Sequence, residues 1–112
     1  PEAAHPPALK TALVIMEQEI RNTLRVGQIA SRVGVSRNHL IHLFNRHLGC
    51  APQTYLRQKR LAVASKLLAR EEIPILSIAE ECGLPSLQHF NKFIRAMTGH
   101  SPRALRSQII KG

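Results

Sequence analysis

Apolar residues recur along this chain at intervals of three and four, the period of an α-helix, and the alternation expected of a β-strand is nearly absent. The pattern predicts seven helices, over about residues 9–21, 26–33, 37–48, 52–69, 75–82, 86–98 and 102–108. The fourth is the longest, about 27 Å at a rise of about 1.5 Å per residue. The predicted fold class is therefore all-α.

Turn and capping residues mark the ends of these helices. Gly34 is placed to end the second helix, and Ser36 is a good N-cap for the third. Gly49 ends the third helix, and Pro52 lies where the first turn of a helix tolerates proline. These residues predict short helices joined by tight turns.

The chain contains an internal repeat. A shift of 49 residues aligns the first helix and the turn of each copy: Val26, Ile29, Ala30 and Gly34 fall on Ile75, Ile78, Ala79 and Gly83. A shift of 50 aligns the second helix and its end: His39, Leu40, Leu43, Phe44, Gly49 and Pro52 fall on His89, Phe90, Phe93, Ile94, Gly99 and Pro102. One residue inserted at 85–86 explains the change of shift. Each copy consists of a helix, a glycine turn and a helix. This order is typical of the helix-turn-helix motif, whose second helix enters the DNA major groove.

Small residues at equivalent positions support this interpretation. Ala30 and Ala79 each lie four residues before a turn glycine, and we expect the two helices of each copy to cross closely there. Gly34 and Gly83 are expected to adopt a positive φ angle in the turn. The two copies are therefore predicted to be homeodomain-like subdomains joined by the long fourth helix.

Charge indicates the partner. The 112 residues carry a net charge of +9, with a pI near 10.9, and residues 21–70 contain ten Lys or Arg and no acid. A chain this basic is expected to bind a polyanion, and the repeat favours duplex DNA. Two second helices held by a helix of about 27 Å would reach successive major grooves, about 34 Å apart. One chain would then read a long, non-palindromic site without dimerising.

The polar faces of the two second helices are the candidate reading surfaces. In the first copy this face carries Asn38, His42 and Asn45, flanked by Ile41 and Arg46, and in the second Gln88, Lys92 and Arg95, flanked by Asn91. Asn and Gln pair with adenine, and Lys reaches guanine acceptors. The alternative is that these are ordinary solvated residues. His39 and His89 lack a third ligand at suitable spacing, so packing or a phosphate contact is favoured over a metal site.

The chain resembles the DNA-binding domain of the AraC/XylS family of bacterial transcription regulators over about residues 9–107. The resemblance rests on "IASRVGVSRNHLIHLF" (29–44), "RLAVASKLL" (60–68), "IPILSIAEECGL" (73–84) and "FNKFIRAMTGHSPRALR" (90–106). The last segment is similar to the family signature, here Phe90, Lys92, Ile94, Gly99, Ser101, Pro102 and Arg106. This sequence departs from the family pattern at His42, Lys92, Ile41, Leu87 and Leu105.

The resemblance implies a seven-helix fold with two helix-turn-helix units. It also implies sequence-specific binding to promoter DNA, with activation through RNA polymerase. Base contacts are implied at Asn38, Ile41, His42, Leu87, Gln88, His89 and Lys92, and we expect phosphate contacts at Ser36, Arg37, Asn45, Arg46 and Arg95.

The predicted organisation follows from these segments: a linker (1–8), a first helix-turn-helix subdomain (9–50), a connecting helix (51–69), a second subdomain (70–108) and a tail (109–112). The linker "PEAAHPP" suggests the C-terminal part of a longer protein with an effector-binding and dimerisation domain. A free-standing small protein is the alternative.

Other classes of protein fit the sequence less well. No Gly-rich phosphate loop, metal-ligand cluster or oriented nucleophile is found, so no enzyme and no cofactor are predicted. The four aromatic residues fall on or near predicted core faces, which disfavours a single-strand or RNA binder, and the charge distribution disfavours a helical protein-interaction module. Two cysteines, no apolar run above five residues and no signal-peptide pattern indicate the cytoplasm, at the nucleoid.

Overall fold

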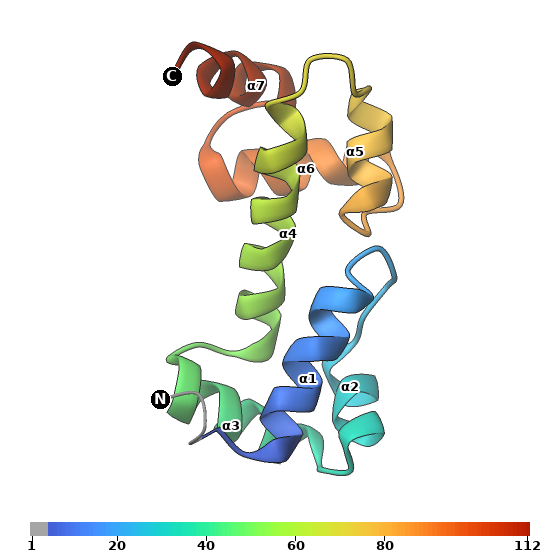
Figure 1. Cartoon of the computed structure of the whole chain (residues 1–112), viewed down its shortest axis with the longest axis vertical. Helices are drawn as coiled ribbons and strands as arrows, with labels where there is room; N and C mark the ends of the chain where they lie inside the picture. The colour runs from blue at the N-terminus through green and yellow to red at the C-terminus, as the bar shows by residue number, and fades with distance from the viewer. Residues whose placement is uncertain (1–4) are drawn as a thin grey trace. The chain divides into compact units, whose positions relative to one another are not determined.

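The computed structural model describes residues 5–112 and contains helices but no strand over that range, which confirms the predicted all-α class (Figure 1). Its seven helices are α1 (Pro7–Gln18), α2 (Val26–Val33), α3 (Arg37–Leu48), α4 (Pro52–Leu68), α5 (Ile75–Glu81), α6 (Leu87–Thr98) and α7 (Pro102–Lys111). Each agrees with a predicted helix to within a few residues at its ends.

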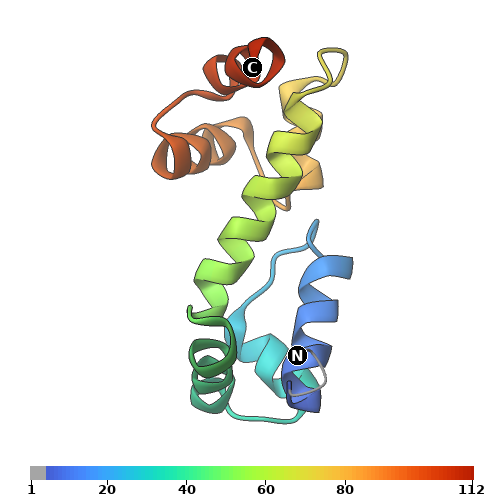
Figure 2. The same ribbon diagram turned by 60° about the vertical axis from the view of Figure 1, so that its left-hand side comes forward.

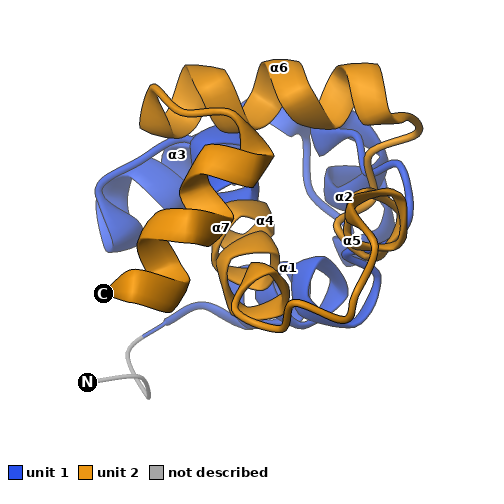
Figure 3. Ribbon diagram, turned by 90° about the horizontal axis from the view of Figure 1, so that it is seen from above, with its two compact units in different colours: residues 1–58 blue, residues 59–112 orange. Residues whose placement is uncertain are grey.

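The chain forms two compact units, one up to residue 58 and one from residue 59 on (Figure 3). The boundary falls inside α4, so each unit takes part of this helix into its own core. Leu56 packs in the core of the first unit, whereas Ala64 and Leu68 pack in that of the second. The sequence had suggested a separate connecting helix over residues 51–69, and the structure divides that helix between the units.

The first unit packs α1, α2 and α3 around one apolar core (Figure 2). The sequence predicts that Leu40, Leu43, Phe44 and His47 face inward on α3, and the first three are buried whereas His47 is partly buried. On α1 the expected inward stripe is Leu9, Leu13, Met16 and Ile20, but Ala12 and Ile15 are also buried. α1 packs against both α2 and α3 and therefore buries a wider face than a single stripe.

The second unit repeats this plan with α5 and α6 packed on the second part of α4. Its buried residues are Ala64, Leu68, Ile78, Ala79, Cys82, Phe90 and Ile94. Partly buried Leu105 and Ile109 add α7 to the same core. Cys82 is fully buried in this core.

The two helix-turn-helix turns have the same hydrogen bonds. In the first, Gly34 has φ 82°, and the N–H of Val35 donates to the carbonyl of Ala30 at 3.0 Å. In the second, Gly83 has φ 78°, and the N–H of Leu84 donates to the carbonyl of Ala79 at 3.0 Å. The predicted positive φ angles are confirmed, and both turns are Schellman motifs in which the orphan carbonyls at the helix end are satisfied.

Equivalent serines start the second helix of each copy. Ser36 Oγ accepts the N–H of His39 at 3.0 Å, and Ser86 Oγ accepts the N–H of His89 at 3.2 Å. The N-cap predicted at Ser36 is confirmed. Ser36 and Ser86 are 50 residues apart, which agrees with the one-residue insertion in the second turn.

Three helix ends differ from the prediction by two or three residues. α1 ends at Gln18 rather than at about residue 21. α1 begins at Pro7, so Pro7 and Ala8 belong to a helix rather than to the predicted linker, and residues 1–4 lie outside the described part of the chain. Proline at the first helical position is favoured because it lacks an N–H that would be unbonded there. α7 continues to Lys111, through most of the predicted tail, because Ile109 packs on the second core.

The buried alanines of the two turns provide a stability test. We expect Ala30→Leu and Ala79→Leu each to lower the free energy of unfolding by about 1–3 kcal/mol, because the added side chain has no room between the crossing helices. Thermal melts measure the effect, and Ala62→Leu at an exposed position of α4 is the control. Melts unchanged for both core variants would show that the helix pairing is misassigned.

Candidate nucleic-acid interface

α3 presents a polar face opposite the core of the first unit. Arg37, Asn38, His42 and Arg46 are exposed, whereas Ile41 is half-buried beside them. The helix contains no acidic residue. This is the face on which the sequence places base and phosphate contacts.

α6 presents the equivalent face in the second unit. Gln88, His89, Lys92 and Arg95 are exposed, and Leu87 is 42% exposed although it is apolar. α6 also contains no acidic residue. The two faces therefore share their position, exposure and sign of charge.

The side chains on these two faces differ in whether they already form hydrogen bonds within the chain. Over residues 5–112, the side chains of Asn38, Gln88 and Lys92 make no hydrogen bond or ion pair within the chain. By contrast, Asn45 Nδ2 donates to the carbonyl of Ile41 at 3.0 Å, and His89 Nδ1 lies 3.0 Å from Ser86 Oγ. The first three can be fully used for recognition, whereas Asn45 and His89 are partly engaged already.

One acidic side chain of the first unit, Glu19, forms an ion pair with a cation of α2. Glu19 accepts two hydrogen bonds from Arg32, at 2.8 and 2.6 Å, and this pairing lowers the pKa of the Glu19 carboxyl. The pair joins the end of α1 to α2. Arg32 therefore neutralises the charge of Glu19, and α3 itself contains no acidic residue.

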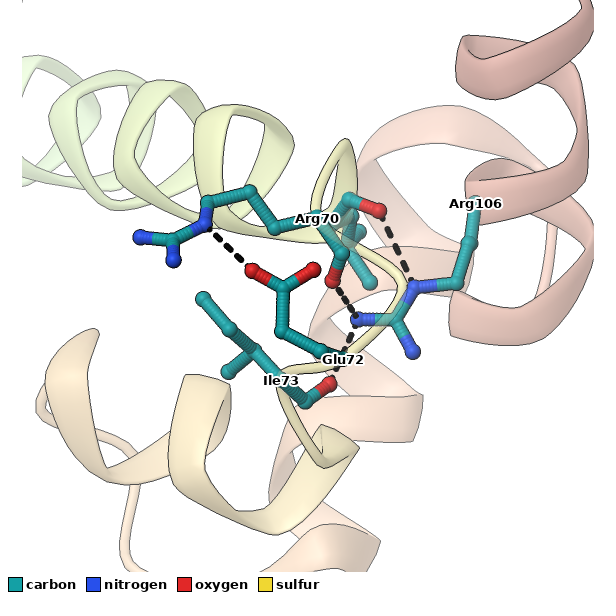
Figure 4. Close-up of polar contacts among 5 residues, drawn as sticks. Arg70, Glu72, Ile73 and Arg106 are labelled. Atoms are coloured by element: carbon teal, nitrogen blue, oxygen red, sulfur yellow. Dashed lines mark hydrogen bonds and ion pairs between the residues drawn. The ribbon is translucent and has the colours of Figure 1, made fainter.

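Two arginines hold the second unit together through backbone carbonyls. Arg106 of α7 donates to the carbonyls of Leu68, Arg70 and Ile73, at 3.0, 3.1 and 2.7 Å (Figure 4). The guanidinium thereby joins the end of α4 and the following loop to α7. The resemblance singled out Arg106, but the sequence alone did not reveal what it contacts.

Arg60 contacts the end of α5, and the sequence did not predict this contact. It is only 8% exposed, and its Nη1 donates to the carbonyl of Cys82 at the end of α5. A signal was present, because Arg60 lies four residues after Leu56 and four before Ala64 on the apolar side of α4. An arginine at such a place predicts a buried acceptor. Here it stabilises the carbonyl end of α5, just before the turn into α6.

Burial also changes the acid–base chemistry of this site. It lowers the pKa of Arg60, and it raises the pKa of the Cys82 thiol to about 12. The thiol is therefore protonated near neutral pH, and the thiolate is the nucleophilic form. Cys82 is a packing residue.

Neither a metal site nor a membrane span emerges from the described residues. Over residues 5–112, no three His, Cys, Asp or Glu side chains gather closely enough to hold a metal ion. None of the helices in that range has the length and apolar character to cross a bilayer.

The family model described as a helix-turn-helix domain matches residues 29–108, which include both helix-turn-helix turns. A solved structure of an AraC-type regulator from Chromobacterium violaceum is 37% identical, with a TM-score of 0.78 and 92% of each chain covered. The chain belongs to the AraC/XylS family. As an AraC-type helix-turn-helix domain it is a sequence-specific DNA-binding domain of a bacterial transcription regulator.

Other AraC-type relatives extend the comparison. The transcriptional regulator GbdR of Pseudomonas aeruginosa is 34% identical over 97 residues, and the activator AarP of Providencia stuartii is 31% identical over 94. The match covers 87% of this chain but 26% of GbdR, and 84% of this chain and 70% of AarP. The DNA-binding domain of AdpA, solved with a target DNA, is 25% identical with a TM-score of 0.80, and 91% of each chain is covered. The chain thus spans about a quarter of GbdR and most of AarP.

Proposed function

We propose that the chain binds promoter DNA with α3 and α6 in successive major grooves. The observation that carries this proposal is the repetition of one exposed, acid-free, cationic helix face in the two units. Each face follows the same glycine turn and the same serine cap. The AdpA domain, whose structure contains its target DNA, supports this use of the fold.

The exposed residues divide by chemistry into proposed base contacts and proposed phosphate contacts. Gln88 and Lys92 are proposed to contact base edges, with Leu87 against thymine methyl groups and His89 beside them. On α3 the proposed base contacts are Asn38, Ile41 and His42. The proposed phosphate contacts are Ser36, Arg37, Asn45, Arg46 and Arg95, which fix the register of the protein on the duplex.

The names of the relatives support a proposal for the regulatory role. We infer activation of transcription through contact with RNA polymerase, which the name of AarP as a transcriptional activator supports. GbdR, of which this chain covers 26%, supports the further proposal that an effector-binding and dimerisation domain acts together with this one. The proposed place of action is the bacterial nucleoid, and no catalytic step is proposed.

A binder of single strands is the main rival in the nucleic-acid class. Such proteins stack bases on exposed aromatic side chains. Here Phe44 and Phe90 are fully buried, and Tyr55 and Phe93 are partly buried and packed on the two cores. A competition gel with duplex DNA, single-stranded DNA and RNA tests the proposal. Duplex is expected to compete best, and equal competition by a single strand would contradict the proposal.

Substitutions on α3 and α6 separate the residues that contact bases from those that contact phosphates. We expect Lys92→Ala to relax the preference at one or two base pairs, a loss of about 1–3 kcal/mol of discrimination. Arg95→Ala and Arg46→Ala are expected to weaken binding to all sequences about equally, because phosphate contacts carry no base information. His42→Ala should lose less sequence information than Lys92→Ala.

In-vitro selection with each variant measures these preferences. Arg46→Ala and Arg95→Ala are the matched controls, since each removes one exposed cation from α3 or α6. If His42→Ala removed more sequence information than Lys92→Ala, the first unit would be the main reader and this ranking would be wrong.

A further inference from the structure

The second unit contains a groove to which α6 contributes no residue. Its volume is about 580 Å³, and it lies between α7 and the segment over residues 71–75. Its lining includes Arg103, Arg106, Ile110 and Lys111 of α7, with Ile75 and Glu71 on the other side. We call it the α7 groove. Since no residue of the α6 reading face lines it, the groove is separate from the proposed DNA contacts of this unit.

The groove is preformed. The three carbonyl hydrogen bonds of Arg106 join α7 to the loop that leads into α5, as Figure 4 shows. Both walls of the groove are therefore held in place before any partner arrives. Arg106 itself is occupied by these bonds, so recognition falls to the other lining residues.

The remaining lining residues combine aliphatic side chains with two cations, and on α7 Ile110 lies beside Lys111, about two turns from Arg103. Ile110 is 43% exposed, and Ile75 lines the same groove. Arg103 and Lys111 are exposed, and neither forms an ion pair anywhere in residues 5–112. Eight residues of helix separate them, or about 12 Å. Glu71 is the one acidic lining residue.

We propose that the α7 groove binds an amphipathic helix of a partner protein. The partner helix presents an aliphatic residue to Ile110 and Ile75, and two carboxylates about two turns apart to Arg103 and Lys111. Apolar helix faces bind in grooves of this kind, and the paired opposite charges fix the register. This is a protein-binding function beyond DNA recognition.

A peptide titration tests the proposal. The probe is a fluorescent helical peptide of about 18 residues, with two Glu about seven residues apart on one face and a Leu on that face beside one of them. We expect saturable binding to the whole chain in about 50 mM salt. Arg103→Glu and Lys111→Glu should each weaken binding by about tenfold, and Ile110→Ser by about threefold or more. Lys66→Glu, an exposed charge reversal in the same unit outside the groove, should change it by less than about twofold.

Binding to duplex DNA is measured in parallel. Ile110→Ser should keep wild-type affinity for duplex, so that loss of peptide binding is separated from loss of the DNA-binding function or of the fold. A peptide in which both Glu are Lys should not bind. The proposal is wrong if the acidic peptide does not bind, if Lys66→Glu weakens it as much as Arg103→Glu, or if a short duplex displaces it, which would assign the groove to DNA phosphates.

Discussion

Raising the salt concentration from about 50 to about 200 mM is expected to weaken duplex binding by about 10³–10⁵-fold. The exposed cations Arg37, Arg46, Lys92 and Arg95 lie on helices without acidic residues, so bound DNA releases counterions at both reading faces. Neutralising roughly six to ten phosphates gives a slope of log affinity against log salt of about −5 to −9. Fluorescence anisotropy of a labelled duplex measures this slope.

Single substitutions test whether the cations of the α3 and α6 faces determine this salt dependence. Arg46→Ala is expected to make the slope shallower by about one, as the loss of one phosphate contact does. Lys10→Ala, at an exposed cation of α1, is the control and should leave the slope unchanged. A wild-type slope shallower than about −2 would contradict a footprint that includes both units.

Arg106→Ala is expected to lower the free energy of unfolding by about 2–4 kcal/mol. The change removes three charge-assisted hydrogen bonds to the carbonyls of Leu68, Arg70 and Ile73, of which those to Leu68 and Ile73 are partly buried and the one to Arg70 is exposed. Hydrogen bonds to charged groups contribute about 1.5–3 kcal/mol each, and water replaces part of this at a half-exposed site. Urea denaturation followed by circular dichroism measures the loss.

Two variants provide controls for Arg106→Ala. Arg106→Lys keeps the charge but lacks the planar fork that reaches several carbonyls, so an intermediate loss is expected. Arg103→Ala removes an exposed arginine of the same helix that makes no hydrogen bond or ion pair in the described part of the chain, and should change stability by less than about 0.5 kcal/mol. A loss below about 0.5 kcal/mol for Arg106→Ala would mean that these carbonyl contacts do not stabilise the fold.

The repeat was predictable because its signals are local. Gly34 and Gly83 reveal turns, since few other residues adopt positive φ, and Ser36 reveals a helix start because its hydroxyl satisfies a backbone N–H. The apolar period of α3 and α6 then determines which face is buried and which is exposed. The polar faces of α3 and α6 were found in this way, whereas Leu87 and His89 came from the family resemblance, and the roles of all these residues in DNA binding remain predictions.

The arginine contacts were not predictable, because their acceptors are backbone carbonyls. Every residue has such a carbonyl, so the sequence does not indicate that Arg60 reaches Cys82 or that Arg106 reaches three carbonyls of the α4–α5 segment. The end of α7 was misjudged for a related reason. Its last turn depends on Ile109 packing against the second core, a contact between distant parts of the chain.

The most direct test of the account is in-vitro selection of random duplex DNA with the purified chain. We expect one extended, non-palindromic motif with two blocks of preferred bases about one helical turn apart, one for α3 and one for α6. The block read by α6 should carry more information, because Gln88 and Lys92 are free and exposed. Recovery of no motif, or of a single short block, would contradict the claim that both units read DNA.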